Sequence, residues 1–528
     1  MRFSDPTENH IGAFFTPLEW TKWVVNKYGV FDRWMGGATI LDPTAGNGSF
    51  LEAFIAIASE KEIQVRPEML KRLFAVEKED RYVADFFLRI RQRYNLDFPE
   101  ENYRCEDLIF SKYHGKADIL VGNPPWRNFS DLPANYKAKI KASFIQYHLA
   151  PRLQDLLLGG SRIDIAALVI AKSLVDHLKE NGSAYFFLPL SVFLNDGAHR
   201  AFRSYKLGAV HFAVEEIHDF KTRAIFDGVS TRYGLVEFKR DAKQSFPIPY
   251  HMSEGSSWVR RLAAPLFNPD DPLSIVGEAD RDFRAFADIE RIEVPPSSKP
   301  RQGVNTCGAN HIFVFDSVEM LNSETAIVSN LVTGKNQLPV KYLYPLAARE
   351  NFKQTIPVPR RFVLLPYNSQ SGRPLELSEL LAEPSLYAYL RERKLILQGR
   401  RGVLINSWIK RGYWWALLGV GTYSFSPYKI MWEAFGKDYF MPKIFSSVGE
   451  ICWQGNQALH AYIPMSNSVE AERICEKLHH PIVNKFLLSN SMEGTCNWAQ
   501  PGKISRLLSV GTKVSLELQR KNNNFIQI

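Results

Sequence analysis

Short apolar runs alternate with amphipathic stretches along the first 240 residues of the chain. Each run has the length and the aliphatic and aromatic content of a buried β-strand, and the stretches between them have helical spacing. This alternation predicts βαβ units, and therefore a doubly wound, mostly parallel sheet with helices on both faces. The predicted strands lie at 38–41, 73–76, 119–121, 184–190, 210–218 and 232–238.

Two helices of this region can be predicted from the sequence. Residues 50–59 follow a glycine-rich turn, and residues 165–178 repeat apolar side chains with helical spacing. Asp164 is expected to be the N-cap of the second helix, because its carboxylate can accept from a first-turn N–H group. The pair Asn181-Gly182 is expected to end that helix.

The second half of the chain has a different residue composition. Pro, Ser and Asp become frequent in FNPDDPL and EVPPSSKP, which predicts a domain boundary near residue 245. We expect residues 1–245 to form one domain, 246–300 a connecting region and 301–528 a second, mixed α/β domain. The final residues, 520–528, are expected to fray.

Charge is distributed unevenly between the halves. The net charge is +9, and residues 351–450 hold 14 Lys and Arg against 7 Asp and Glu. A basic face in the second half indicates a polyanionic partner, although a solvated basic surface would give the same composition.

Other features of the composition limit the class of protein. Five cysteines lie far apart with no Cys-x-x-Cys pair, which argues against a zinc site and a disulfide framework. No apolar run approaches about 18 residues, and the N-terminal sequence lacks the apolar core of a secretory signal. We expect a cytoplasmic protein without a bound metal or a membrane contact.

The segment 39–50, TILDPTAGNGSF, predicts a strand, a tight turn and a helix start. Gly46 and Gly48 lack Cβ atoms, so a ligand can approach the backbone closely, and Asp42 at the strand end can meet an ammonium group. The spacing differs from the dinucleotide GxGxxG motif, and the GKS/T sequence of a phosphate loop is absent.

Acidic residues follow the next two strands as well. Glu77 ends the second strand and can accept both hydroxyls of a ribose, although Asp80 is a competing candidate. Asp107 follows a further strand, expected just before Cys105 and third in chain order, and can accept from the amino group of an adenine ring. Since ligands of open α/β sheets bind at the carboxyl ends of the strands, these acids predict a nucleoside pocket.

The fourth strand leads into Asn123-Pro124-Pro125-Trp126. Two consecutive prolines fix φ and remove two backbone donors, so the loop is rigid. The side-chain oxygen of Asn123 and the carbonyl of Pro124 can both accept from one planar aromatic NH2 group. Two fixed acceptors make the nitrogen lone pair available and stabilise the positive charge that develops on it. Trp126 would stack on the target base.

These motifs, in this order, resemble the gamma-class amino-methyltransferases of DNA, which include the Taq-type adenine-N6 enzymes of restriction–modification systems. GAFFTPLEWTKWVV at 12–25 is similar to the N-terminal cofactor motif of that family, and DPTAGNG at 42–48 to its glycine-rich motif. NPPW at 123–126 resembles the catalytic motif, with Trp in place of the usual Tyr or Phe. NGSAYFFLPLS at 181–191 is similar to the sixth-strand region, and 217–238 contains Phe226, whose counterpart stacks on the target base.

The resemblance implies a seven-stranded methyltransferase sheet and S-adenosylmethionine as the cofactor. It also implies transfer of a methyl group to N6 of an adenine that has left the DNA helix. Asn123, Pro124 and Trp126 are the implied catalytic residues, and Trp126 and Phe226 are the implied stacking residues. The implied cofactor contacts are Thr16, Asp42, Thr44, Ala45, Gly46, Gly48, Glu77, Asp107 and Asn123.

The C-terminal half is expected to contact double-stranded DNA. Candidate residues are Arg400, Arg401, Lys410 and Arg411, which lie among Trp408, Trp414 and Trp415. A separate restriction endonuclease or the subunits of a defence system would be the protein partners. We expect association with the prokaryotic nucleoid through DNA.

Three other functions remain open from the residues alone. A protein-glutamine methyltransferase can use the same tetrapeptide, because a side-chain amide is also a planar NH2 group. An RNA methyltransferase acting on adenine or guanine is the second alternative. The third is a non-catalytic DNA-binding subunit, although the intact NPPW sequence argues against it.

Overall fold

We describe the protein from a computed structural model, which divides into an N-terminal unit, Met1–Asp288, and a C-terminal unit, Ile289–Ile528. The structure describes residues 14–111, 115–150, 163–195, 198–229, 231–278, 284, 290–435, 439–447, 449, 451–489 and 499–510. The predicted fraying of residues 520–528 lies outside these residues, as do the first two residues of the motif at 12–25.

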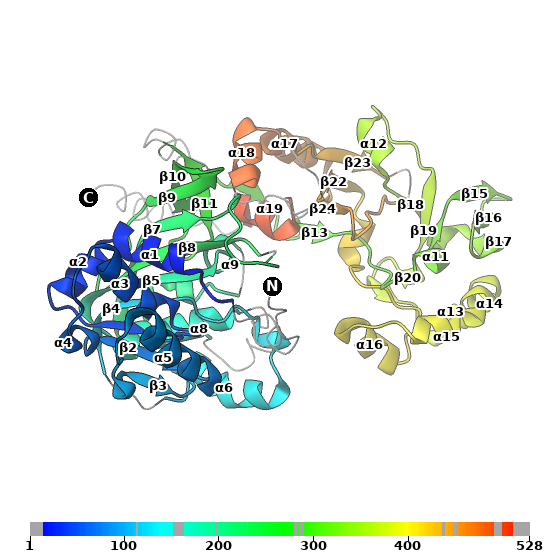
Figure 1. Cartoon of the computed structure of the whole chain (residues 1–528). Coiled ribbons are helices and arrows are strands. Elements are labelled where there is room, and N and C mark those ends of the chain that lie inside the picture. Colours follow the sequence, from blue (N-terminus) through cyan, green and yellow to red (C-terminus); the bar gives the residue numbers. More distant parts are fainter. Residues whose placement is uncertain are drawn as a thin grey trace. The chain divides into compact units, whose positions relative to one another are not determined.

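The N-terminal unit alternates helices and strands as far as β5 and continues mainly as strands (Figure 1). Its helices are α1 (Leu18–Lys27), α2 (Val30–Met35), α3 (Ser49–Glu60), α4 (Pro67–Leu70), α5 (Asp80–Tyr94), α6 (Ala134–Gln146), α8 (Ile165–Lys172) and α9 (Ser191–Leu194). Its strands are β1 (Ile40–Asp42), β2 (Leu73–Glu77), β3 (Tyr103–Cys105), β4 (Ala117–Gly122), β5 (Leu178–Pro189), β6 (Lys206–Leu207), β7 (Val210–Asp219), β8 (Tyr233–Arg240), β9 (Ile248–Glu254), β10 (Ser257–Pro265) and β11 (Leu273–Gly277).

These strands form one sheet in the order β11-β10-β9-β7-β8-β5-β4-β1-β2-β3, with β6 paired to β7. Strands β1 to β5 are parallel to their neighbours among themselves, and β8 is antiparallel to both β5 and β7. The predicted fold class, a doubly wound and mostly parallel α/β sheet, is confirmed, but the sheet has eleven strands rather than the predicted seven, because β6, β9, β10 and β11 add to it. The order changes direction between β1 and β4, and such switch points are where open α/β sheets bind ligands.

Alternation along the central strands explains why helices cover both faces. On β4, Ile119 and Val121 belong to one apolar core, while Leu120 belongs to the other. Helices α1, α2, α3 and α5 contribute to the first core, and α6 and α8 contribute to the second. Because successive side chains of a strand point to opposite faces, these apolar runs can be buried only by a helix layer on each side.

Two boundaries differ from the predictions. The sheet does not end near residue 245, because β9 pairs in parallel with β7 and carries β10 and β11 with it. The predicted connecting region 246–300 is therefore largely part of the N-terminal sheet, and the predicted boundary lies too early. The helix predicted at 165–178 begins at Ile165 with Asp164 as its N-cap, but it widens into a π turn over Ser173–His177 and does not reach Asn181.

The C-terminal unit contains several small sheets and short helices. Its sheets have the orders β13-β24-β22-β23, β14-β19-β18, β15-β16-β17, β12-β25 and β20-β21. Its strands are β12 (Ile292–Val294), β13 (Arg301–Gln302), β14 (Val314–Phe315), β15 (Ser317–Met320), β16 (Thr325–Asn330), β17 (Gly334–Pro339), β18 (Leu343–Leu346), β19 (Arg361–Leu364), β20 (Tyr367–Asn368), β21 (Arg373–Pro374), β22 (Tyr428–Glu433), β23 (Lys443–Ser446), β24 (His460–Met465) and β25 (Leu508–Val510). Its helices are α11 (Asn310–Phe313), α12 (Arg349–Lys353), α13 (Leu377–Leu381), α14 (Pro384–Glu392), α15 (Lys394–Gln398), α16 (Val403–Lys410), α17 (Ser468–Leu478), α18 (Pro481–Ser489) and α19 (Pro501–Leu507).

This composition confirms the prediction of a mixed α/β C-terminal region. One core of this unit gathers Trp414 and Trp415 with apolar side chains of β14, β16, β18, β19 and α14. No helix among the described ranges is long and apolar enough to span a bilayer.

Candidate active site

A cavity of about 800 Å³ opens at the carboxyl ends of β1, β2, β3 and β4. It lies at the switch point between β1 and β4, so the turn after each of these strands supplies part of its wall. All of the predicted cofactor contacts line it except Gly48: Thr16, Asp42, Thr44, Ala45, Gly46, Glu77, Asp107 and Asn123.

The glycines of the turn serve the packing of the turn itself. Gly46 and Gly48 have φ values of +55° and +76°, a conformation that residues with a Cβ rarely adopt. A Cβ on Gly46 would lie 2.9 Å from the Phe15 ring, and one on Gly48 would overlap the buried Phe86 ring. Gly48 thus allows α5 to pack closely against the turn, a role that the expected ligand approach did not include.

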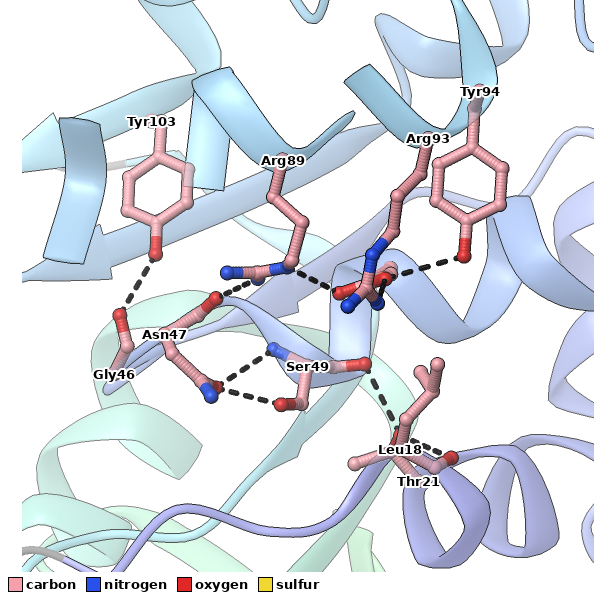
Figure 2. Close-up of polar contacts among 10 residues, drawn as sticks. Leu18, Thr21, Gly46, Asn47, Ser49, Arg89, Arg93, Tyr94 and Tyr103 are labelled. Atoms are coloured by element: carbon pink, nitrogen blue, oxygen red, sulfur yellow. Dashed lines mark hydrogen bonds and ion pairs between the residues drawn. The ribbon is translucent and has the colours of Figure 1, made fainter. Parts of the chain in front are cut away.

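Polar contacts from α5 and β3 hold the turn (Figure 2). The carbonyl of Asn47 accepts from Nη2 of Arg89, and the carbonyl of Gly46 accepts from the Tyr103 hydroxyl at 3.1 Å. Nε of Arg89 donates to the buried carboxylate of Glu52 at 2.7 Å, and Arg93 donates to its second oxygen at 2.9 Å. These contacts fix two backbone carbonyls of the turn, so its inner surface is set before any ligand enters.

The three predicted acids face the same cavity, each with a backbone contact that orients it. Asp42 accepts from the N–H of Thr44 at 3.1 Å, and Asp107 accepts from the N–H of Ile109 at 3.0 Å. Glu77 accepts from the N–H of Gly46 at 2.7 Å and from that of Glu79 at 2.9 Å. An ionised carboxylate has about four acceptor positions, so each acid keeps positions for a ligand.

Burial also changes the proton affinity of these groups. Asp42 is 1% exposed, and this burial raises its pKa well above the usual range, with Glu77 adding a smaller repulsion. Burial likewise raises the pKa of Glu77, although N–H donors from Glu79 and Gly46 oppose the shift. A cationic ligand group next to Asp42 would favour its ionised form, so this position suits an ammonium group.

Four polar side-chain atoms of the lining residues are buried without a hydrogen-bond partner among the described residues: Thr16 Oγ1, Thr44 Oγ1, Glu106 Oε1 and Asn123 Oδ1. A buried polar group without a partner costs about 1–3 kcal/mol, so such atoms indicate a missing ligand. S-adenosylmethionine offers an ammonium, two ribose hydroxyls and an adenine amine to acids, and a carboxylate to hydroxyl groups. The residues of this cavity therefore fit S-adenosylmethionine.

The NPPW loop follows β4 directly and places Asn123 and Pro125 on the cavity wall, while Pro124 and Trp126 are buried and lie outside the lining. Nδ2 of Asn123 donates to the Phe14 carbonyl at 2.7 Å. A carbonyl can only accept, so this contact fixes the orientation of the amide and leaves Oδ1 as the free acceptor. Gly122 permits this geometry, because a Cβ there would lie 2.9 Å from Asp42 Oδ1.

Trp126 and Phe226 are neighbours, but they do not bracket an open slot. Their ring centres are 5.0 Å apart with planes at 86°, and Phe14 and Tyr233 also contact Trp126. Nε1 of Trp126 is buried and has no hydrogen-bond partner within the described part of the chain. A planar base could enter between the two predicted stacking rings only after one of them moved.

Sequence reasoning missed several residues of the cavity. The Tyr136 hydroxyl donates to Asp107 at 2.9 Å, and Tyr82 packs edge-on against Phe15 with ring centres 4.8 Å apart. Glu106 lines the wall beside Asp107 and has a buried oxygen without a partner among the described residues. The aromatic residues carried no local signal, since α6 and α5 reach the cavity only through the fold.

Of the four predicted DNA contacts, one is buried in the structure and three are exposed. Arg400 is 7% exposed, and its guanidinium donates to the carbonyls of Leu397, Thr306 and Trp414 at 2.9, 3.2 and 2.7 Å. All three nitrogens of its guanidinium donate to carbonyls inside the unit, which argues against the predicted DNA contact. Arg401, Lys410 and Arg411 are exposed.

One further cluster could hold a metal ion by residue type: Glu216, His218 and His251. The two imidazole rings are stacked, with centres 4.5 Å apart and planes at 10°. A shared ion would then lie far outside both ring planes, where neither nitrogen lone pair points. Glu216 instead accepts from His251 and Tyr28, and Lys27 lies 3.9 Å away, which is the pattern of a hydrogen-bonded network.

The sheet and the cavity define a class of protein, the methyltransferases that use S-adenosylmethionine, and comparison with known proteins supports it. No family model matches the chain. The chain is 23% identical over 339 residues to the modification methylase CviBIII of Paramecium bursaria Chlorella virus NC1A, covering 61% of this chain and 72% of that protein. It is 23% identical over 445 residues to the type II methyltransferase M.NspV of Nostoc sp. (strain ATCC 29411 / PCC 7524), covering 81% of each.

Among solved structures, the chain resembles the type IIL restriction-modification enzyme MmeI, which was solved in complex with DNA. The TM-score is 0.51 at 12% identity, and the match covers 97% of this chain and 76% of MmeI. At this identity the likeness concerns the fold. The comparisons agree with the predicted fold class and with S-adenosylmethionine as the cofactor.

Proposed function

We propose that this chain is a DNA methyltransferase that transfers a methyl group from S-adenosylmethionine to N6 of adenine. The observation that carries the proposal is the free acceptor of Asn123, held in a rigid loop on the wall of a cavity that fits the cofactor. Similarity to a modification methylase and to a type II methyltransferase supports the same reaction class.

Five parts of the cavity would hold the cofactor. Asp42 would accept from its ammonium group, and Glu77 would accept from the ribose hydroxyls. Asp107 would accept from the adenine amine, while Thr16 and Thr44 offer unpaired hydroxyls at the cavity wall. Gly46 and Ala45 would form the floor under the ligand.

Asn123 Oδ1 and the Pro124 carbonyl would accept from the target amine. Two fixed acceptors draw the nitrogen out of conjugation with the ring and stabilise the positive charge that develops on it. When bound, the cofactor would supply a sulfonium methyl group to this nitrogen, and its sulfur would keep the bonding pair. The methylated nitrogen would then lose one proton to water. Because the charge is stabilised as it forms, the residues need no strong base before attack.

A paired adenine must leave the duplex before its amine can meet Asn123. Extrusion costs a few kcal/mol, which stacking in the pocket would offset. Trp126 and Phe226 are the proposed stacking residues, and the contact between them means that one ring must move as the base enters. The C-terminal unit would supply the remaining DNA contacts, and a separate restriction endonuclease or defence-system subunit would be the partner.

The test is methyl transfer by the purified chain with isotopically labelled S-adenosylmethionine and three acceptors: duplex DNA, RNA and a protein extract. Nucleosides and peptides from each reaction are then identified by mass spectrometry. The proposal expects label in N6-methyladenine from DNA, and no label when Asn123→Ala replaces the intact protein. Label in another base, in RNA or in glutamine would overturn it.

A further inference from the structure

Helix α16 (Val403–Lys410) has two sharply different faces. Ile405 is fully buried, and Trp408 and Ile409 are half-buried on the same side. The opposite face consists of Val403, Leu404, Asn406, Ser407, Lys410 and Arg411, all exposed, and a shallow hollow runs along five of these residues. At 3.6 residues per turn, positions 403, 406, 407, 410 and 411 form one continuous stripe.

This outer face is unusual in both its charge and its apolar content. Between Glu392 and Glu433 the sequence contains no Asp or Glu, while Lys410 and Arg411 belong to the stripe and Arg401 lies just before the helix. These three cations make no ion pair with any described residue. The acid that the structure brings near the end of the helix, Glu376, accepts from the Tyr413 hydroxyl. Val403 and Leu404 are 88% and 69% exposed, so the face also presents apolar side chains to solvent.

Hydrogen bonds of Arg400 hold both ends of the helix to the C-terminal unit. Arg400 joins the carbonyl of Leu397, before the helix, to that of Trp414, after it, and to Thr306 of the body of the unit. Figure 1 shows α16 after α13, α14 and α15 in a group of helices with no strand among them. A helix that is held rigidly and presents an exposed polar face is suited to bind in a groove of a partner rather than to cover an apolar core.

We propose that α16 enters the major groove of duplex DNA and that Asn406 reads a base there. The inference rests on the proposed function and assigns its specificity to one helix. The major groove admits an α-helix, and Asn pairs with the edge of adenine through two hydrogen bonds. Lys410 and Arg411 contact phosphates, and Val403 or Leu404 contacts a thymine methyl group.

The charge of the stripe favours DNA over a protein partner, since a polyanion satisfies all three cations at once. Duplex RNA fits less well, because its major groove is too narrow and deep for side chains to read. The chemistry therefore selects B-form DNA.

The test measures binding of the full-length chain to duplex DNA with a randomised central segment, between about 50 and 200 mM salt. Lys410→Ala and Arg411→Ala should each weaken binding to every sequence and reduce the slope of log K against log salt by about 0.9. Asn406→Ala should keep the slope and lower discrimination at one base pair by about 5- to 150-fold. Lys335→Ala, an exposed lysine on β17, is the matched control and should change neither quantity.

Each outcome has a distinct meaning. If the intact protein binds duplex DNA while the α16 variants keep its slope and its sequence preference, the inference about α16 is overturned and the proposed function stands. If the intact protein binds no DNA, or binds duplex RNA as tightly as duplex DNA, the inference about α16 and the proposed function are both overturned. Thermal unfolding and S-adenosylmethionine binding of each variant should match the intact protein, which separates loss of contact from loss of fold.

Discussion

The cavity of the N-terminal unit and the outer face of α16 are both polar surfaces, but their side chains are held in opposite ways. In the cavity, Asp42 and Glu77 are buried and oriented by backbone N–H groups. On α16, Lys410 and Arg411 extend into solvent. Interactions of buried groups are strong and depend on exact geometry, whereas those of exposed charges are weak and screened by salt.

The difference teaches where function is sensitive to single changes. A cavity whose groups are fixed before the ligand arrives spends no binding free energy on ordering them. A surface that meets a polyanion distributes its affinity over many weak contacts. Substitutions in the cavity should therefore produce large, specific losses, and substitutions on the helix should produce small losses that depend on salt.

The largest effect is expected from Asn123→Ala. Removing the free Oδ1 acceptor should lower the rate of methyl transfer by at least about 10²- to 10³-fold, since one preorganised polar group contributes that much. The affinity for S-adenosylmethionine should stay within about threefold. Single-turnover kinetics and calorimetry measure the two quantities, with Asn128→Ala on the following loop as the control. An equal loss of rate and cofactor affinity would show that Asn123 acts on the cofactor alone.

The next effect concerns Asp42 and pH. Burial raises the pKa of this carboxyl, so a fraction of the free protein carries it protonated above the usual carboxyl range. An ammonium ligand binds the ionised form, so its affinity should rise with pH until Asp42 is ionised in the free protein. Asp42→Asn should bind S-adenosylmethionine about 10- to 100-fold more weakly and should lose this pH dependence. An unchanged pH profile in the variant would contradict the role.

A smaller effect, on stability rather than chemistry, is expected from Gly48→Ala. The added methyl group would overlap the Phe86 ring at a positive φ, which should lower the free energy of unfolding by about 1–3 kcal/mol. Gly228→Ala, at a positive φ with open space around it, is the control for the backbone effect alone. Equal losses in the two variants would show that Phe86 makes no difference.

The smallest effect is expected from Tyr136→Phe. The Tyr136 hydroxyl orients Asp107, so its loss should weaken binding of S-adenosylhomocysteine by about 3- to 10-fold, in keeping with one hydrogen bond of about 1 kcal/mol. The inosine analogue of this ligand lacks the amine, so its affinity should not change. A similar loss for both ligands would mean that Tyr136 does not act through the amine site.

The sequence predicted those features of the fold and the site that depend on the order of strands and motifs along the chain. Each of Asp42, Glu77, Asp107 and Asn123 ends or follows a strand, and parallel strands bring such positions to one edge. What depends on distant contacts was missed. The pairing of β9 with β7 moved the domain boundary, and nothing near Tyr136 in the sequence indicates that it contacts Asp107.

The neighbouring residues Arg400 and Arg401 also show that sequence alone does not reveal distant contacts. Arg400 and Arg401 are adjacent and chemically identical, and composition assigned them one role. Burial separates them: three carbonyls surround the guanidinium of Arg400, while Arg401 is exposed. Only the path of the chain around Leu397 and Trp414 determines which arginine stays exposed.

The most direct test of the central claim is sequencing of genomic DNA, with detection of modified bases, from cells that express the intact protein and from cells that express Asn123→Ala. The account predicts N6-methyladenine at one short sequence with the intact protein and none with the variant. The absence of any modified base with the intact protein, while the purified chain still binds S-adenosylmethionine, would contradict it.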